Sequence, residues 1–575
     1  MKSNQPNVGR RKALKTIGTA VAGIAVGAAV GWFAKPVAEV YKTVTSTATS
    51  TVTQERTVTV ERTVTVTPTV TQVTTTRPSR PWEGKWWEPF MPRPDRYLYP
   101  RYPWTKDILG VPEGEYMYED DWARQVDWDK VKGKFEGKTI TCTWEGTATD
   151  VPEFYKPTFE KLTGAKINVV AIPTELLHEK IMADLVSGKG EYDIMAAYFG
   201  WGKAYTPYLY DLRELFEEFG FDIRAYHPFC LMPNILGLDG KLYGFVSDAD
   251  IWCFTARMNI LRKVGIDKLP QTWEEVLAAC EALMPLKEKE GIYPFVAVYN
   301  AMGFPCAMSF FDIALQWEDF KILKGDGSWE PDFLGSSGGG REALMVYKKL
   351  IEFSPPGALS YIYADARDDI WLPGKAAMTV GWTCLPHLAH YPDISKISPY
   401  FTDNIIAVGR VPKGTTQRSP GIWPCTAAAI NKASRNPELA FLYTVFMLSQ
   451  ESMTVLALGS PSENHVGFKE VLADKRTWRL SPGWEITWKY GWSAAMSPFC
   501  FLPESYEIAE AVGTEIHRYL RGEITDPDEA LKNAEKAART ILERGGYLGP
   551  RAPEVPPLTL DEWCKKVGLE NPKPI

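Results

Sequence analysis

The sequence has little of what marks a metal site, a disulfide framework or a nucleic-acid surface. It has six histidines, and its nine cysteines include no Cys-x-x-Cys pair and none before Cys142. His387 and His390 stand three apart without an acidic or cysteine partner at ligand spacing, so we expect no metal site. A formal net charge of -7 over 575 residues favours neither nucleic acid nor an anionic membrane surface as a partner.

Disulfide pairing is permitted in an exported chain, but scattered cysteines give no connectivity, and an odd number leaves at least one thiol unpaired. No Asn-x-Ser/Thr sequon is present. The absence of cysteine near the N-terminus also excludes a lipid-modified cysteine directly after an export signal. What the chain does have is 21 tryptophans in a body of ordinary globular composition, 45% hydrophobic and 23% charged.

The N-terminal segment has the features of a targeting signal. A basic cluster from Arg10 to Lys15 precedes an uncharged, mainly Ala, Gly, Val and Ile run from Thr16 to Ala34, which is the pattern of an export signal. GRRKALK resembles the twin-arginine signal. The run is also nearly long enough to span a bilayer, with the basic end held in the cytoplasm. Residues 1–37 are therefore interpreted as an export signal or membrane anchor. Cleaved and anchored forms both stay open, and we favour the anchor.

Two segments of unusual composition follow. Residues 38–80 are mainly Thr, Val and Ser, with ERTVTV occurring twice in succession, and this stretch offers too little apolar bulk for a core of its own. We interpret it as a stalk. Residues 81–137 are rich in Pro, Trp and Tyr, as in WEGKWWEPFMPRPDRYLYPRYPW, which predicts an extended arm lying across a folded surface.

After Gly137 strands and helices alternate. KTITCTW reads as a strand, VPEFYKPTFEKLTG as a helix with a glycine stop, and AKINVVAI as a second strand, followed by another helix and the strand in EYDIMAAYFGWG. This alternation is a β-α-β pattern, which predicts an α/β fold with parallel strands and right-handed crossovers. Ligands in such sheets bind beyond the carboxyl ends of the strands, so Glu145 and Trp201, each just after a strand, are expected in one crevice.

Seven motifs occur in a fixed order over roughly 400 residues. They are GAKINVV, LVSGKGEYDIM, DGKLYGFVSDAD, ILRKVGIDKLPQTWEEVLAAC, WLPGKAAMTVGW, VPKGTTQRSPGIWPCTAAAINKASRNPELAFLYTVFML and EITDPDEALKNAEKAARTIL. With these motifs in order, the chain from about 138 to 542 resembles the extracellular solute-binding proteins of ABC importers. In particular it resembles the family 1 binders that include the maltose and oligosaccharide receptors.

The resemblance implies the two-lobe, type II periplasmic-binding-protein-like fold. Each lobe would be a mostly parallel sheet flanked by helices, with the ligand in the cleft between them. On that pattern lobe 1 takes 138–246 plus 427–459, and lobe 2 takes 247–426 plus 460–575. The segments VSDADIWCF and GIWPCTAAAI would cross between the lobes and contain the hinge.

A sugar receptor needs flat aromatic platforms for C–H faces and a few carboxylates for hydroxyls. In WLPGKAAMTVGW the pattern predicts a buried strand that delivers Trp382 to the cleft, although core packing explains a tryptophan at a strand end equally well. The other candidates lie in strand-end loops, at the crossings or at the start of a late helix. The expected substrate-binding residues are Glu145, Trp201, Asp248, Asp250, Trp252, Trp382, Trp423 and Tyr506.

The expected function is that of an extracytoplasmic substrate-binding component of an ABC importer. It would capture a small solute, expected to be a carbohydrate, without a cofactor, and deliver it to the permease subunits. A secreted glycan-degrading enzyme and a surface structural or adhesion protein are the alternatives. No catalytic residues are assigned, because Asp248 and Asp250 lie about 7 Å apart on one strand, whereas a glycosidase pair flanks the bond from separate sides.

Overall fold

The computed structural model describes residues 117–571, apart from 119, 147, 199–200, 233–234, 387–405, 421–424, 460–464 and 479. The expected anchor, the stalk and most of the arm lie outside the described residues. Every described residue belongs to one compact unit, which lies within Ser79–Ile575.

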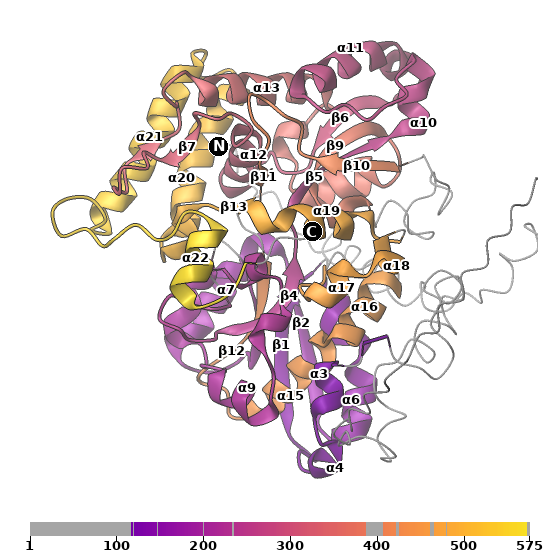
Figure 1. Cartoon of the computed structure of the whole chain (residues 1–575), viewed down its shortest axis with the longest axis vertical. Helices are drawn as coiled ribbons and strands as arrows, with labels where there is room; N and C mark the ends of the chain where they lie inside the picture. Colours follow the sequence, from indigo (N-terminus) through magenta and orange to yellow (C-terminus); the bar gives the residue numbers. More distant parts are fainter. Residues whose placement is uncertain are drawn as a thin grey trace, which may run out of the picture. The chain divides into compact units, whose positions relative to one another are not determined.

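The first sheet has five strands in the order β2-β1-β3-β12-β4. β1 pairs in parallel with β2 and β3, as the β-α-β pattern predicts, while β12 is antiparallel to both β3 and β4. The strands are β1 (Thr139–Glu145), β2 (Lys166–Ile172), β3 (Ile194–Ala197), β4 (Gly244–Ala249) and β12 (Cys425–Ile430). Together with the helices packed on it, this sheet forms the first lobe (Figure 1).

The second sheet has four strands in the order β10-β5-β9-β6 and is the centre of the second lobe. β9 is parallel to β6 and antiparallel to β5, so the stretch AAMTVGW is a fully buried inner strand. The strands are β5 (Trp252–Arg257), β6 (Tyr293–Ala297), β9 (Ala376–Trp382) and β10 (Ile406–Arg410). Figure 1 shows this sheet in the upper half and the first sheet in the lower half. The fold is therefore the expected two-lobe α/β architecture, in which two of the four strand pairs of the first sheet and one of the three pairs of the second are parallel.

Helices cover both sheets. In the first lobe these include α5 (Asp150–Phe154), α6 (Lys156–Thr163), α7 (Thr174–Ser187), α15 (Pro437–Leu448) and α16 (Gln450–Gly459). In the second lobe they include α11 (Trp273–Glu290), α12 (Phe304–Ala314), α13 (Gly339–Phe353), α20 (Ser505–Leu520) and α21 (Pro527–Arg544).

Local signals in the sequence explain where two of these helices begin and end. Gly164, at φ 75°, ends α6 in the left-handed region that glycine adopts without strain. Thr272 caps α11 by accepting a hydrogen bond from the Glu275 N–H at 3.1 Å. In the same turn the Glu275 carboxylate accepts a hydrogen bond from the Gln271 N–H at 2.6 Å.

The first core takes in two stretches that the expected lobe boundaries place elsewhere. Buried side chains between Val466 and Met496, together with Trp563, pack in the first core, although 460–575 was expected in the second lobe. Trp122 and Trp128, from the end of the expected arm, are also part of this core. The sequence pattern missed both because lobe membership of short helices depends on which neighbours they contact, and their periodicity carries no information about that.

All nine cysteines are buried free thiols. The burial of Cys253, beside the crossing between the lobes, raises the pKa of its thiol to about 12, so the unreactive protonated form prevails. Among the described residues no single helix has both the length and the apolar character needed to cross a bilayer. In the same part of the chain one bent pair, Pro437–Leu448 and Gln450–Leu458, passes the test when the two helices are taken together, by length and composition alone.

Candidate functional site

The chain crosses from the first sheet to the second between β4 and β5, at Asp250 and Ile251. This is the segment VSDADIWCF that the sequence predicts as a crossing. The return segment leads into β12, and its residues 421–424, which include Trp423, lie outside the described residues. The prediction for Trp423 therefore stays a prediction.

Asp248 and Asp250 are engaged in hydrogen bonds at this crossing. Asp248 Oδ1 accepts from the backbone N–H of His465 at 2.7 Å. Asp250, only 4% exposed, accepts from the Thr383 hydroxyl, and its Oδ1 lies 3.0 Å from His465 Nδ1. Thr383 Oγ1 also lies 3.2 Å from Thr487 Oγ1. The two carboxylates thus fasten three separate chain segments together at the junction of the lobes.

Two glycines make that close packing possible. A Cβ on Gly483 would lie 1.9 Å from the carbonyl oxygen of Thr383, so only glycine lets α19 (Pro482–Tyr490) approach the end of β9. A Cβ on Gly381 would lie 2.7 Å from Leu385 Cδ1 and 2.8 Å from Val298 Cγ2. The Gly-Trp pair that ends β9 therefore needs its glycine for packing.

Trp382 joins an aromatic group within the second lobe. Trp252 and Trp382 are cross-strand partners in β5 and β9. Their ring centroids are 5.7 Å apart in an edge-on arrangement, and Trp382 Nε1 donates to Tyr299 Oη at 3.1 Å. Tyr299 in turn stacks on Tyr363 at 5.2 Å. Trp252 is 1% exposed and Trp382 6%, so in this structure both indoles are covered by protein.

A second aromatic group joins the two lobes. Trp201, which follows β3 in the first lobe, lies 5.7 Å from Tyr506 at the start of α20 in the second. His178 of α7 contacts both rings, at 5.3 Å from Trp201 and 5.1 Å from Tyr506. Phe304 contacts Tyr506 from the second lobe at 5.5 Å. Aromatic side chains of both lobes therefore meet at this point.

The structure brings some of the predicted residues together and separates others. Trp252 pairs with Trp382, Trp201 meets Tyr506, and Asp248 and Asp250 share the His465 segment. Glu145 is the last residue of β1, half-buried and opposite Ile172 of β2. Glu145 ends β1 and Trp201 follows β3, which is the parallel neighbour of β1. That the two residues share one crevice stays a prediction.

Sequence reasoning missed His178, Tyr299, Tyr363 and Phe304. Tyr299 stands two residues after the end of β6 (Tyr293–Ala297), so the strand-end rule that selected Trp201 could have selected it. His178 projects from a helix, and nothing in the helical periodicity of α7 distinguishes it. Its Nδ1 lies 2.9 Å from Tyr205 Oη, and burial lowers the pKa of the imidazole below its usual value, which favours the neutral ring near pH 7.

The described side chains are of the kinds that bind a ligand by ring contacts and hydrogen bonds. Buried indole N–H donors on Trp201 and Trp252 have no hydrogen-bond acceptor among the described residues. In that same part of the chain, no group of three or more His, Cys, Asp or Glu side chains is placed to hold a metal ion. Two pockets described on the lobe surfaces, one around α11 and one around Tyr243, are lined by none of the seven described candidates.

The comparison with protein families identifies the family to which this two-lobe chain belongs. A model of the bacterial extracellular solute-binding proteins matches residues 145–454, more than half of the chain. The chain belongs to the bacterial extracellular solute-binding protein family. It is thus a binding protein of the ABC transporter type that acts outside the cytoplasm, as the motifs suggested.

Individual members of the family are distant in sequence. A probable amino-acid ABC transporter periplasmic-binding protein of Sinorhizobium fredii is 21% identical over 402 residues, covering 68% of this chain and 86% of the relative. The maltose-bound MalE3 of T. maritima is similar in structure, with a TM-score of 0.62, 20% identity, and coverage of 71% of this chain and all of that one. An Agrobacterium radiobacter solute-binding protein in complex with ribitol gives 0.58 at 20% identity, covering 71% and 99%. The similarity in structure supports the two-lobe fold of this solute-binding protein.

Proposed function

We propose that this solute-binding protein captures a neutral sugar or sugar alcohol between its lobes and delivers it to the permease of an ABC importer. The observation that carries the proposal is the contact of Trp201 with Tyr506, which brings aromatic rings of the two lobes to one place. Rings of this kind cover the C–H faces of a sugar, and a ligand that contacts both rings contacts both lobes at once.

The polar groups support a ligand rich in hydroxyls. The indole N–H groups of Trp201 and Trp252 have no acceptor among the described residues, as is also the case for four tryptophans outside the two aromatic groups, and a sugar hydroxyl would be such an acceptor. An unsatisfied buried donor costs about 1–3 kcal/mol. Bonding it only when ligand is present contributes to the preference for the bound state.

Closure of the lobes is the proposed response to the ligand. A ligand shifts a two-state equilibrium only by its difference in affinity for the two states, so contacts to both lobes favour the closed form. The Asp250–Thr383 and Asp248–His465 bonds lie at the crossing about which the lobes would rotate. In this proposal these carboxylates hold the hinge and do not touch the ligand, in contrast to the role expected from sequence.

The N-terminal segments complete the proposal. The uncharged run from Thr16 to Ala34 would retain the receptor at the membrane, and the Thr-rich segment would act as its stalk. Fractionation of expressing cells, with intact-mass measurement of the purified protein, distinguishes a retained anchor from a cleaved signal. Release into the medium at the mass of a processed chain would contradict the anchor.

A thermal-shift screen tests the solute class. Maltose, ribitol and mannitol form one arm and the twenty common amino acids the other, because a relative carries the name of an amino-acid binder. A ligand at a hundred times its dissociation constant stabilises the folded state by about 2.7 kcal/mol, which is readily seen in the unfolding temperature. Stabilisation by an amino acid and by no sugar or polyol would reject the proposed class, and calorimetry with the best ligand gives its affinity.

A further inference from the structure

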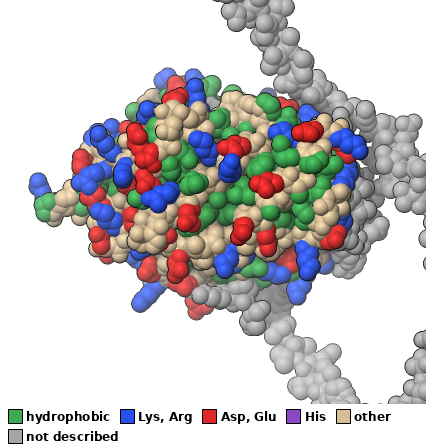
Figure 2. All heavy atoms as spheres, turned by 90° about the horizontal axis from the view of Figure 1, so that it is seen from above, with side chains coloured by type: hydrophobic (Ala, Val, Ile, Leu, Met, Phe, Trp, Pro, Cys, Tyr) green, Lys and Arg blue, Asp and Glu red, His purple; other side chains and the backbone are tan. Residues whose placement is uncertain are grey.

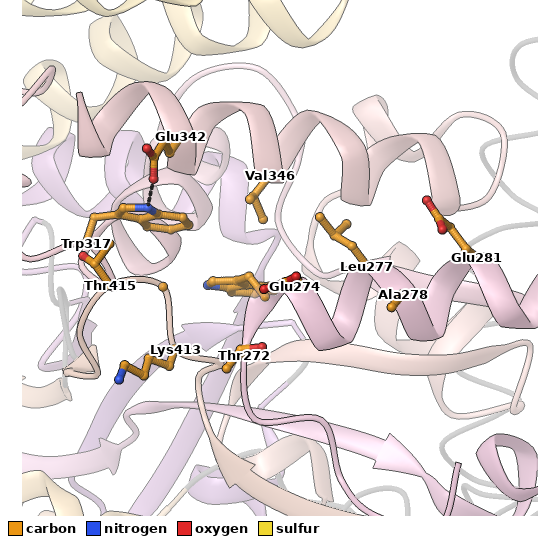
Figure 3. Close-up of a pocket in the computed structure, with 12 residues that line it drawn as sticks. Thr272, Glu274, Leu277, Ala278, Glu281, Trp317, Glu342, Val346, Lys413 and Thr415 are labelled. Atoms are coloured by element: carbon orange, nitrogen blue, oxygen red, sulfur yellow. Dashed lines mark hydrogen bonds between the residues drawn. The ribbon is translucent and has the colours of Figure 1, made fainter. Parts of the chain in front are cut away.

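A groove on the second lobe, away from the candidate site, has no role in the proposed function. It has a volume of about 500 Å³ and runs between α11 and α13, with the 413–415 loop at one end (Figure 3). Figure 3 shows Leu277 and Val346 projecting into the same space from the two helices, with Glu281 and Glu342 toward opposite ends.

The floor of the groove is firmly built. Trp317 is 4% exposed, and its Nε1 donates to Glu342 Oε2 at 2.7 Å. A Cβ on Gly414 would lie 2.9 Å from the Trp317 ring, so the loop packs directly on the indole. Trp273, at the first turn of α11, is 2% exposed and donates its backbone N–H to Lys413 O at 3.0 Å. The hollow is therefore a preformed feature of the packing.

Apolar side chains line the middle of the groove, between its exposed charged residues. Ala278 is exposed, Leu277 and Val346 are half-buried, and the neighbouring Met345 of α13 is 50% exposed. Figure 2, which views the molecule from above, shows hydrophobic side chains gathered toward the middle of the face, with charged side chains among and around them. An apolar strip framed by polar residues is typical of a surface that contacts another protein.

The rim of the groove is acidic. Glu274, Glu281 and Glu342 line it against one ammonium group, that of Lys413. Glu274, Glu281 and Lys413 form no ion pair with any residue in the described part of the chain, so their charges are available to an occupant. The excess of carboxylates disfavours an anionic lipid surface or a polyanion and favours a basic partner.

We propose that this groove is the docking site for a basic amphipathic helix of a partner protein. The lining positions of α11 run from Trp273 to Glu281, about 12 Å at 1.5 Å per residue, which matches two turns of a third helix lying along α11 and α13. Its apolar stripe covers Leu277, Ala278 and Val346, and its lysines or arginines pair with the rim. The inference does not depend on which solute binds between the lobes.

Two designed peptides of about 14 residues test the proposal, long enough to form helix on a surface. One contains only leucine and lysine at amphipathic spacing, and the other has glutamate in place of lysine. Fluorescence anisotropy measures the binding of each to the full chain. The lysine peptide is expected to bind and the glutamate peptide to fail.

Matched variants locate the binding. Ala278→Arg fills the groove and is expected to weaken the lysine peptide about tenfold or more. Ala282→Arg places the same residue on an exposed position of the same helix outside the lining and is expected to change affinity less than about twofold. Equal loss in both variants, or no binding by wild type, overturns the proposal. Displacement of the peptide by maltose also overturns it, because the groove would then be a saccharide site.

Discussion

Trp252 and Trp382 face one another across β5 and β9, with ring centroids 5.7 Å apart and planes at 76°. The pair lies next to the crossing between the lobes, since Asp250 precedes Trp252 by two residues and Thr383 follows Trp382. The tryptophan pair therefore lies directly beside the Asp250–Thr383 bond of the crossing.

Trp382→Phe is expected to weaken solute binding by about 1–3 kcal/mol, because the variant loses aromatic area and the N–H bond to Tyr299. Titration calorimetry with the solute found by the screen measures the change. Trp371→Phe is the matched control, since Trp371 is fully buried in the same lobe and lies outside both aromatic groups. Unchanged affinity in Trp382→Phe would remove Trp382 from the site.

Trp201 and Tyr506 are expected to be energetically coupled across the lobes. Trp201→Ala, Tyr506→Ala and the double variant form a cycle, and an aromatic contact predicts a coupling of about 0.5–1.5 kcal/mol in solute affinity. Calorimetry on the four proteins gives the coupling. Additive losses would mean that the two rings bind the solute independently or not at all.

Thr383→Val is expected to lower the free energy of unfolding by about 1–3 kcal/mol, because it leaves Asp250 without the Thr383 hydroxyl in a buried site. Denaturant unfolding measures the change. Thr540→Val removes a hydroxyl on the exposed face of α21 and serves as the control. Equal stability of the two variants would show that the hinge bonds are dispensable.

The contacts of Tyr118 and Asp121 with Glu451 predict a pH dependence of folding stability. Asp121 Oδ1 accepts from the Glu451 N–H at 2.8 Å, and Glu451 Oε1 accepts from the Tyr118 N–H at 3.2 Å. Burial raises the pKa of both carboxyls, and for Glu451 the nearby Asp121 charge adds to the effect. Each unit of a raised pKa costs about 1.4 kcal/mol once the group is ionised in the folded state.

The contribution of these carboxyls is therefore fully present below their ordinary pKa values, near pH 4, and is lost as the pH rises through the raised values. Glu451→Gln is expected to be less destabilised than wild type on going from pH 5 to pH 8, as read from unfolding temperatures. Glu438→Gln, at an exposed ion pair with Lys134, is the control and should follow wild type. A parallel decline of wild type and Glu451→Gln would contradict the assignment.

Much of the fold could be read from the sequence, because strands and helices of the body are periodic and are bounded by residues such as Gly164 and Thr272. The candidate site was harder to predict from the sequence. The strand-end rule selected Trp201 and Trp382, whose part in solute binding stays a prediction, and it could not show that Trp382 bonds to Tyr299. Asp248 and Asp250 were expected to face a ligand, and their bonds to the His465 segment come from residues more than 200 positions away. Such pairings have no local signature.

The nine buried thiols limit how long the protein stays functional outside the cell. While the fold persists, dissolved oxidants cannot reach the sulfur atoms. A single excursion to the unfolded chain would present all of them to the medium at once, and wrongly joined or over-oxidised chains would not return. The working life of this receptor is therefore governed by how rarely it opens fully, a rate more than an equilibrium.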